Sequence, residues 1–207
     1  MRKILLPLVI IVVAVGVIYF VLHKKQEKSS PKQRPLAVSQ HTDSFNQSIN
    51  AMLASYDTLT EAFVNWDSAA VAKNAVTLSQ KLNAIDLSEL KKDSVIYQTA
   101  ISYKDNFATD LKTIEDAPGI AKKRTAFNSF SQNLYDLLRT VHYDRSKIYL
   151  QECPMAFNNE ATPGMWLSRN EAIRNPYMGL HHPKYGKAMI ECGDTKDSVN
   201  FTGATAL

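Results

Sequence analysis

The side chains best suited to metal or redox chemistry gather near the C-terminal end of the chain, between Cys153 and Gly193. This stretch holds both cysteines and four of the six methionines of the 207-residue sequence. Thiolate and thioether sulfurs are soft ligands that suit Cu(I), so the stretch predicts a site for a soft metal ion. The candidate ligands are Cys153, Met155, His181, His182, Met189 and Cys192, with Met178 inside the stretch and His142 ahead of it as further candidates.

The two cysteines admit two states, and the sequence leaves both open. Outside the cytosol, a Cys153–Cys192 disulfide would close the stretch and stabilise the fold by about 4 kcal/mol through loop entropy. As free thiols, the same pair could bind copper together with Met155 or Met189. A Cys₂His₂ zinc site is a further alternative, but the sequence lacks the closely spaced ligand pairs of structural zinc modules.

The sequence indicates no catalytic machinery. A nucleophilic Cys153 would need a base such as His142 or His182 beside it, and nothing in the spacing places one there. There is also no phosphate-binding glycine loop and no metalloprotease helix motif. We therefore expect a binding protein rather than an enzyme. Copper is the expected cofactor, zinc is the alternative, and a disulfide-bonded pair would need neither.

The first residues predict a membrane anchor. Residues 4–22 contain no charged side chain. As a helix this run would be about 28 Å long, close to the roughly 30 Å hydrocarbon core of a bilayer and longer than the apolar core of a cleaved signal peptide. We expect residues 1–23 to form an uncleaved signal anchor that spans the inner membrane once, with the soluble domain in the periplasm.

Residues 24–42 are polar and predict a linker between anchor and domain. The basic residues are concentrated at this end of the chain. Residues 1–34 hold seven of the 24 Lys and Arg residues and one of the 20 Asp and Glu residues, so the net charge of +4 becomes −2 for residues 35–207. A nucleic-acid-binding domain would carry the basic excess on its own surface, which excludes nucleic acid as a partner.

Residues 43–144 predict four amphipathic helices. Apolar residues recur at steps of three and four, first from Phe45 to Trp66. Helices of this kind joined by short turns form antiparallel bundles. The predicted boundaries are Asp67 as the N-cap of the second helix, Asp86 and Glu89 as a capping box for the third, and Pro118-Gly119 as the break before the fourth.

Residues 145–207 lose the helical period and are rich in Pro and Gly, which predicts an irregular segment. Two short runs, 148–150 and 188–190, could pair as strands. The predicted fold class is all-α: an antiparallel four-helix bundle with an N-terminal transmembrane helix and an irregular, loop-rich C-terminal segment. The side chains expected to pack this segment on the bundle are Tyr149, Phe157, Trp166 and Tyr177.

Four blocks of the C-terminal segment form a signature: Cys153-Pro-Met-Ala-Phe, Trp166-Leu-Ser, Ile173-Arg-Asn-Pro-Tyr and Met189-x-x-Cys-Gly. With the helical part ahead of them, over roughly residues 43–200, they resemble the bacterial domain-of-unknown-function family 3347. Similar domains occur as exported proteins and appended to periplasmic adaptor subunits of copper/silver efflux systems. The resemblance implies an exported, metal-related accessory domain whose partners are metal-efflux or other envelope proteins.

A looser likeness exists to short heavy-metal-binding modules, through Tyr149, Cys153-Pro-Met and Pro163-Gly164, although a second C-x-x-C is missing. The run 180–186 lengthens the connection expected in the closer family and introduces the two histidines. Residues and resemblance together predict a membrane-anchored accessory protein that binds a soft metal ion, copper first, for metal resistance or trafficking. The alternative is an envelope protein-interaction module with a structural Cys153–Cys192 disulfide and no metal.

Overall fold

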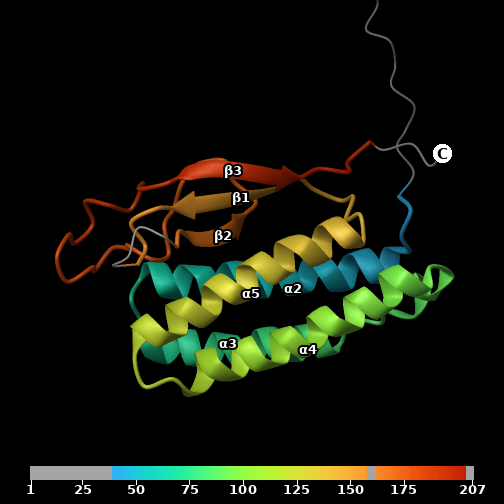
Figure 1. Ribbon diagram of the computed structural model, residues 1–207, viewed down its shortest axis with the longest axis horizontal. Helices are drawn as coiled ribbons and strands as arrows, with labels where there is room; N and C mark the ends of the chain where they lie inside the picture. Colours follow the sequence, from blue (N-terminus) through green and yellow to red (C-terminus); the bar gives the residue numbers. More distant parts are fainter. Residues whose placement is uncertain (1–38, 158–161, 204–207) are drawn as a thin grey trace, which may run out of the picture. The chain divides into compact units, whose positions relative to one another are not determined.

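The structure is a computed structural model of the chain, and it describes residues 39–157 and 162–203. Four long helices dominate it, and a small sheet lies against them (Figure 1). The helices are α2 (Asp43–Val64), α3 (Ser68–Asn83), α4 (Ser94–Asp116) and α5 (Ile120–Thr140), with a 3₁₀ helix, η1 (Ser88–Lys92), ahead of α4. The strands are β1 (Ile148–Cys153), β2 (Gly164–Ser168) and β3 (Asp194–Val199).

Each helix of the bundle packs on the next one in the chain, α2 on α3, α3 on α4 and α4 on α5. The predicted four-helix bundle over residues 43–144 is therefore confirmed. Its centre is aromatic, because the apolar face of each helix carries large rings that need burial. The largest rings buried between the helices are Tyr56, Phe63, Phe107, Phe127 and Phe130.

The predicted helix boundaries are right in part. The carboxylate of Asp67 accepts the backbone N–H of Ala69 and of Ala70, as an N-cap does. Trp66, however, lies past the end of α2 with a positive φ of 57°. Two further findings replace the predicted capping box: α4 begins with Asp93 as its N-cap, and Glu89 bonds to Thr42 instead.

The predicted irregular C-terminal segment is wrong in part, because it contains a three-stranded antiparallel sheet of order β2-β1-β3. The fold is thus not all-α. The run 148–150 does belong to a strand, whereas 188–190 does not: the carbonyl of Ile190 accepts the N–H of Asn175 in a loop. β3 lacks a buried, alternating apolar face, since five of its six residues are not buried, so its pairing with β1 left no hydrophobic pattern to detect.

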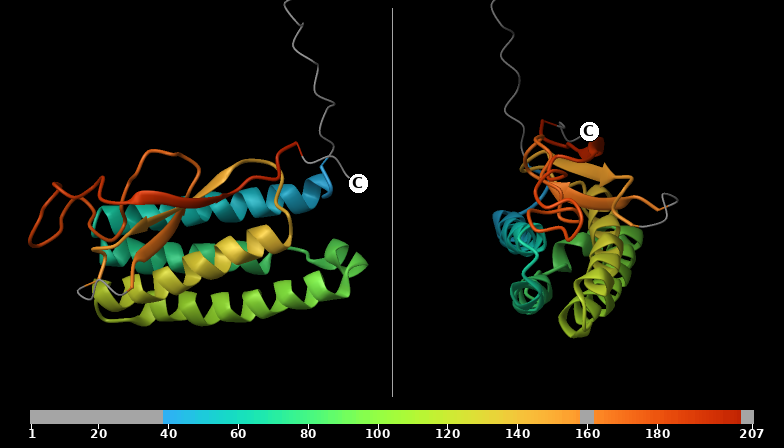
Figure 2. Two further views of the ribbon diagram at one scale, coloured as in Figure 1. Left: turned by 45° about the horizontal axis from the view of Figure 1, so that its top comes forward. Right: turned by 90° about the vertical axis from the view of Figure 1, so that its left-hand side faces the viewer.

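The sheet covers the side of the bundle formed by α2 and α5 (Figure 2). Polar contacts join the two layers: the hydroxyl of Tyr56 on α2 contacts Ser131 Oγ on α5 at 2.8 Å and accepts the N–H of Leu167 on β2 at 2.9 Å. The amide oxygen of Asn128 accepts the N–H of Met165 at 2.7 Å. Because these groups are buried, water cannot replace a partner that is removed, so the hydrogen bonds hold the sheet on the helices.

The predicted transmembrane anchor over residues 1–23 lies outside the described residues, as does most of the predicted linker. Within residues 39–157 and 162–203, none of the helices combines the length and the apolar character needed to cross a membrane. The last four residues of the predicted linker, Ser39 to Thr42, are described, and they contact the end of the bundle.

We predict that Tyr56→Phe lowers the free energy of unfolding by about 1–3 kcal/mol, because it leaves the Leu167 N–H unpaired in a buried place. Urea unfolding followed by circular dichroism measures the change. Tyr97→Phe is the matched control, since the half-buried Tyr97 has no hydroxyl hydrogen bond among the described residues. Equal stability of Tyr56→Phe and wild type would contradict a role for this hydroxyl in joining the two layers.

Candidate functional site

The fold brings the two cysteines together. Cys153 is the last residue of β1 and is fully buried, while Cys192 lies two residues ahead of β3 and is half-buried. Their Sγ atoms are 3.0 Å apart, and both are free thiols. Two residues 39 positions apart thus form one dithiol, as the sequence required for either a disulfide or a shared metal ion.

Gly193 allows the Cys192 segment to approach β1 this closely. Its φ is +136°, a conformation that side chains disfavour. A Cβ atom at this position would collide with the backbone oxygen of Glu152 and lie 3.1 Å from the ring of Trp166. Glycine is therefore required next to Cys192 for a steric reason, which explains why the Cys-Gly pair occurs together.

Asn175 holds the Cys192 segment from the other side. Its side chain is fully buried, and its amide nitrogen donates to the carbonyl of Cys192 at 2.6 Å. Its amide oxygen accepts the N–H of Tyr177 at 2.7 Å and of Met178 at 3.0 Å. One asparagine therefore satisfies three buried backbone groups and fixes the position of the cysteine relative to the loop 175–178.

Tyr177 supports the site from the bundle side. It is fully buried, its ring packs against Trp166 and Phe127, and its hydroxyl donates to the carbonyl of Met165 at 2.5 Å. Burial raises the pKa of this hydroxyl well above its ordinary value, so it stays protonated and serves only as a donor. The predicted packing of Trp166 and Tyr177 on the bundle is confirmed.

Burial keeps the Cys192 thiol protonated when the pair is reduced. Burial, followed by the neighbouring Cys153 sulfur and Asp194, raises the pKa of the Cys192 thiol to about 12. Because the thiolate is the reactive form of cysteine, a dithiol of this kind is a poor nucleophile at neutral pH. A disulfide or a metal ion would remove both protons and avoid the cost of burying a thiolate.

The other predicted ligands differ in how far they are buried. Met155 is 43% exposed, and Met189 is half-buried against the core. His181 is exposed, whereas His182 packs edge-on against Trp66 and accepts two backbone N–H groups through Nδ1. No group of three His, Cys, Asp or Glu side chains in the described ranges is arranged to hold a metal ion.

The two histidines belong to a loop that packs on the end of α2. The N–H of Leu180 donates to the carbonyl of Val64, and Trp66 Nε1 donates to the carbonyl of Met178 at 2.9 Å. Burial, with the nearby Arg124 and Lys184 charges, lowers the pKa of His182. This side chain is thus a neutral packing group at pH 7.

A groove beside the dithiol was missed by the sequence analysis. It has a volume of about 430 Å³ and lies between α2 and the C-terminal segment. Two ion pairs line the groove, Arg169 with Asp57 and Arg174 with Glu61. One wall comes from Ile190 and Glu191, which directly precede Cys192, and another from Trp166. Only the folding of distant segments onto α2 creates this groove, so no local pattern could reveal it.

We predict that Asn175→Ala destabilises the protein by about 1–3 kcal/mol, because three buried backbone groups lose their partner. Cys192 should also react faster with a thiol reagent in the reduced protein, since its segment is no longer held. Urea unfolding and stopped-flow thiol titration measure the two effects. Asn74→Ala, which removes one exposed side-chain bond to Thr58, is the control. Unchanged thiol reactivity would contradict the positioning role.

No curated protein and no solved structure matches the chain. A family model described as "Protein of unknown function (DUF3347)" matches residues 52–146, from within α2 to beyond the end of α5. The match ends ahead of Cys153, so it rests on the helices and leaves the four-block signature untested. It confirms the resemblance noted in the sequence for its helical part: residues 52–146 of this chain are similar to the DUF3347 family.

Proposed function

We propose that this chain is an accessory protein of the cell envelope that binds a soft metal ion, copper(I) first, through Cys153 and Cys192. Its role would be in metal resistance or trafficking, and it would not be an enzyme. The observation that supports the proposal is the 3.0 Å approach of the two sulfurs at the junction of β1 and the segment ahead of β3. Thiol ligands favour Cu(I) over harder ions.

The donor set fits a soft ion that accepts few ligands. Two thiols meet, and neither histidine of the 181–182 pair is near enough to complete a metal-binding group within the described residues. A structural zinc ion needs four ligands, so zinc fits the arrangement less well than copper(I). When bound, the ion would replace the two thiol protons.

The membrane anchor and the periplasmic location are part of the same proposal. They rest on the uncharged run over residues 4–22 and on the polar linker that follows it. In this position the domain would work beside metal-efflux or other envelope proteins. Because the domain itself carries a net charge of −2 over residues 35–207, it would not compete for nucleic acid.

A protein-interaction module with a structural disulfide is the second candidate. It is favoured by the full burial of Cys153 and by the raised pKa of the Cys192 thiol, because structural cysteines are buried and unreactive. A bond between the two would contribute about 4 kcal/mol through loop entropy. The groove lined by Ile190 and Glu191 would then be a partner's docking surface, with one wall fixed by the disulfide.

Cu(I) binding should depend on the two cysteines and not on the histidines. We predict that replacing both Cys153 and Cys192 by Ser weakens Cu(I) binding by more than about 100-fold, because removing ligands costs at least as much as removing their supporting partners. Competition with a colorimetric Cu(I) chelator, under anaerobic and reducing conditions, measures the affinity. His181→Ala with His182→Ala is the matched control and should leave it unchanged. Equal affinities of wild type and the double serine variant would overturn the copper proposal.

Thiol titration separates the two candidates. Protein isolated without reductant and unfolded in denaturant should show two reactive thiols if the pair serves as a metal-binding dithiol. A pair that reacts only after reduction, together with a failure of the reduced protein to compete for Cu(I), would leave the disulfide-bonded interaction module as the function.

A further inference from the structure

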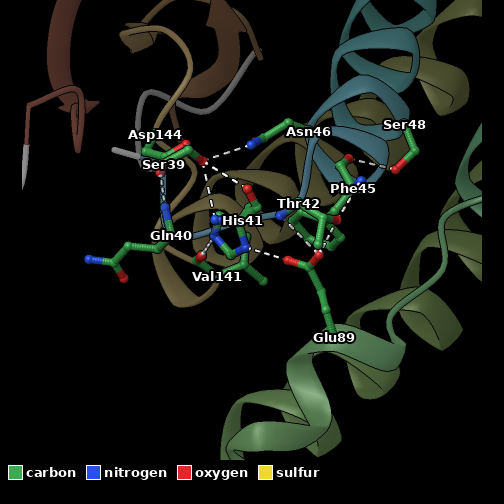
Figure 3. Close-up of polar contacts among 10 residues, drawn as sticks. All are labelled: Ser39, Gln40, His41, Thr42, Phe45, Asn46, Ser48, Glu89, Val141 and Asp144. Atoms are coloured by element: carbon green, nitrogen blue, oxygen red, sulfur yellow. Dashed lines mark hydrogen bonds and ion pairs between the residues drawn. The ribbon is translucent and has the colours of Figure 1, made fainter. Parts of the chain in front are cut away.

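His41 closes a hydrogen-bonded corner at the end of the bundle where α2 begins and α5 ends (Figure 3). Its Nδ1 lies 2.6 Å from Oε1 of Glu89 on η1, and its Nε2 lies 2.6 Å from the carbonyl oxygen of Val141 at the C-cap of α5. The imidazole ring also stacks on Phe45, with 4.7 Å between the ring centroids. One side chain therefore contacts three separate elements of the bundle.

Both partners of the ring are acceptors. A backbone carbonyl can only accept a hydrogen bond, and so can an ionised carboxylate. A neutral imidazole has a single N–H, and only the imidazolium donates from both nitrogens. The two 2.6 Å contacts can therefore be satisfied together only when His41 carries its second proton.

Glu89 is held in its ionised form by further donors. Its Oε2 accepts the N–H of Thr42 at 3.2 Å and the hydroxyl of Thr42 at 2.5 Å. Burial would raise the pKa of Glu89, but the hydrogen bonds from Thr42 and His41 outweigh it, so the pKa is lowered from 4.5. Thr42 is also the N-cap of α2, where the helix dipole favours a negative charge.

A second set of bonds fixes the residues just ahead of His41. Ser39 Oγ donates to Asp144 Oδ1, and the N–H of Gln40 donates to Asp144 Oδ2, both at 2.9 Å. Asn46 Nδ2 donates to Ser39 Oγ at 2.9 Å. Residues 39–42 are thus tied to η1 and to the segment that follows α5, and nearly all of these ties involve side chains (Figure 3).

We propose that His41 is a proton-operated clasp: its imidazolium holds residues 39–42 against the end of the bundle, and loss of the proton releases them. Residues 39–42 are the point where the chain enters the folded domain from its N-terminal side. The clasp therefore controls whether residues 39–42 are held against the bundle or can move away from it.

The other charged groups at this corner do not replace Glu89 as the partner of the ring. Among the described residues, Asp43 pairs with Arg145, Asp86 accepts from Ser88, and Asp144 accepts from Ser39 and Gln40. His142, which follows the acceptor Val141, packs on the ring of Phe201. Lys91 and Lys92, in the last turn of η1, are the cations on the element that carries Glu89.

The sign of the pH dependence follows from the two partners. Both bonds of the ring are present at pH values low enough for His41 to hold its second proton, and one of them is lost when a rise in pH removes that proton. Glu89, with its lowered pKa, contributes stability above its ordinary pKa of 4.5, and this contribution is lost as pH falls further. The clasp is therefore closed in mildly acidic solution and opens on either side of it.

The test uses the full-length chain and compares pH 6 with pH 8. Nitrogen-15 NMR of the His41 ring should show two protonated nitrogens at pH 6 and one at pH 8. Amide exchange at Thr42 and Asn46, corrected for the intrinsic pH effect, should become about tenfold faster at pH 8, which corresponds to one lost charge-assisted bond. In His41→Gln the corrected exchange rates should be the same at both pH values, while His181→Gln, at an exposed histidine, should behave as wild type.

Two results would overturn the proposal. One is a singly protonated His41 ring at pH 6 in wild type, a measurement that does not depend on any variant folding. The other is a pH response in His41→Gln equal to that of wild type, which would assign the response to a different group. Glu89→Gln keeps an acceptor but removes the negative charge that favours the imidazolium, so it should reduce the response.

Discussion

The C-terminal segment stays on the bundle because one short stretch, Asn175 to Met178, supplies both the polar partners and the packing that a buried loop needs. Backbone groups removed from water must find hydrogen bonds within the protein. Asn175 provides three of them through one amide, and Tyr177 fills the space behind the sheet while bonding to β2. The positions of Cys192 and of the His182 loop depend on this attachment, since Asn175 donates to the Cys192 carbonyl and the Met178 carbonyl accepts from Trp66.

The same approach of Cys153 and Cys192 serves two chemical states. In the reduced state Cys192 is a protonated thiol, since burial and the neighbouring sulfur raise its pKa. As a disulfide or as metal ligands the two sulfurs carry no protons. Trp166 and Tyr177 make their surroundings apolar, where a free thiolate charge would be costly. The compartment and the available metal therefore decide the state of the pair, while the fold decides that the two sulfurs meet.

The cysteine pair and His41 occupy different ends of the molecule. β1 ends at Cys153 beside the C-terminal end of α2, whereas His41 precedes the N-terminal end of the same helix (Figure 1). The region around the cysteines is apolar and tightly packed, and at Gly193 there is no room for a side chain. The other is held by charge-assisted bonds around Glu89, so it responds to protons. Metal or redox state and pH would thus act on separate parts of one domain.

The sequence alone determined the four helices of the bundle, because an apolar stripe with a period of 3.6 residues specifies a helix with one face to bury. It also singled out the two cysteines as candidate site residues, and it identified Trp166 and Tyr177 as aromatic rings that pack the C-terminal segment. It did not determine the sheet, since β3 forms by pairing its backbone with β1 and has almost no buried face of its own. The sequence also did not reveal that Glu89 bonds to His41 and Thr42 in place of forming a local capping box.

Only the tertiary structure placed His182 against Trp66 and away from a metal-binding group. The physical reason is the same in each case: a local pattern specifies which surface a segment must bury, but contacts between residues far apart in the sequence depend on how the buried surfaces fit together.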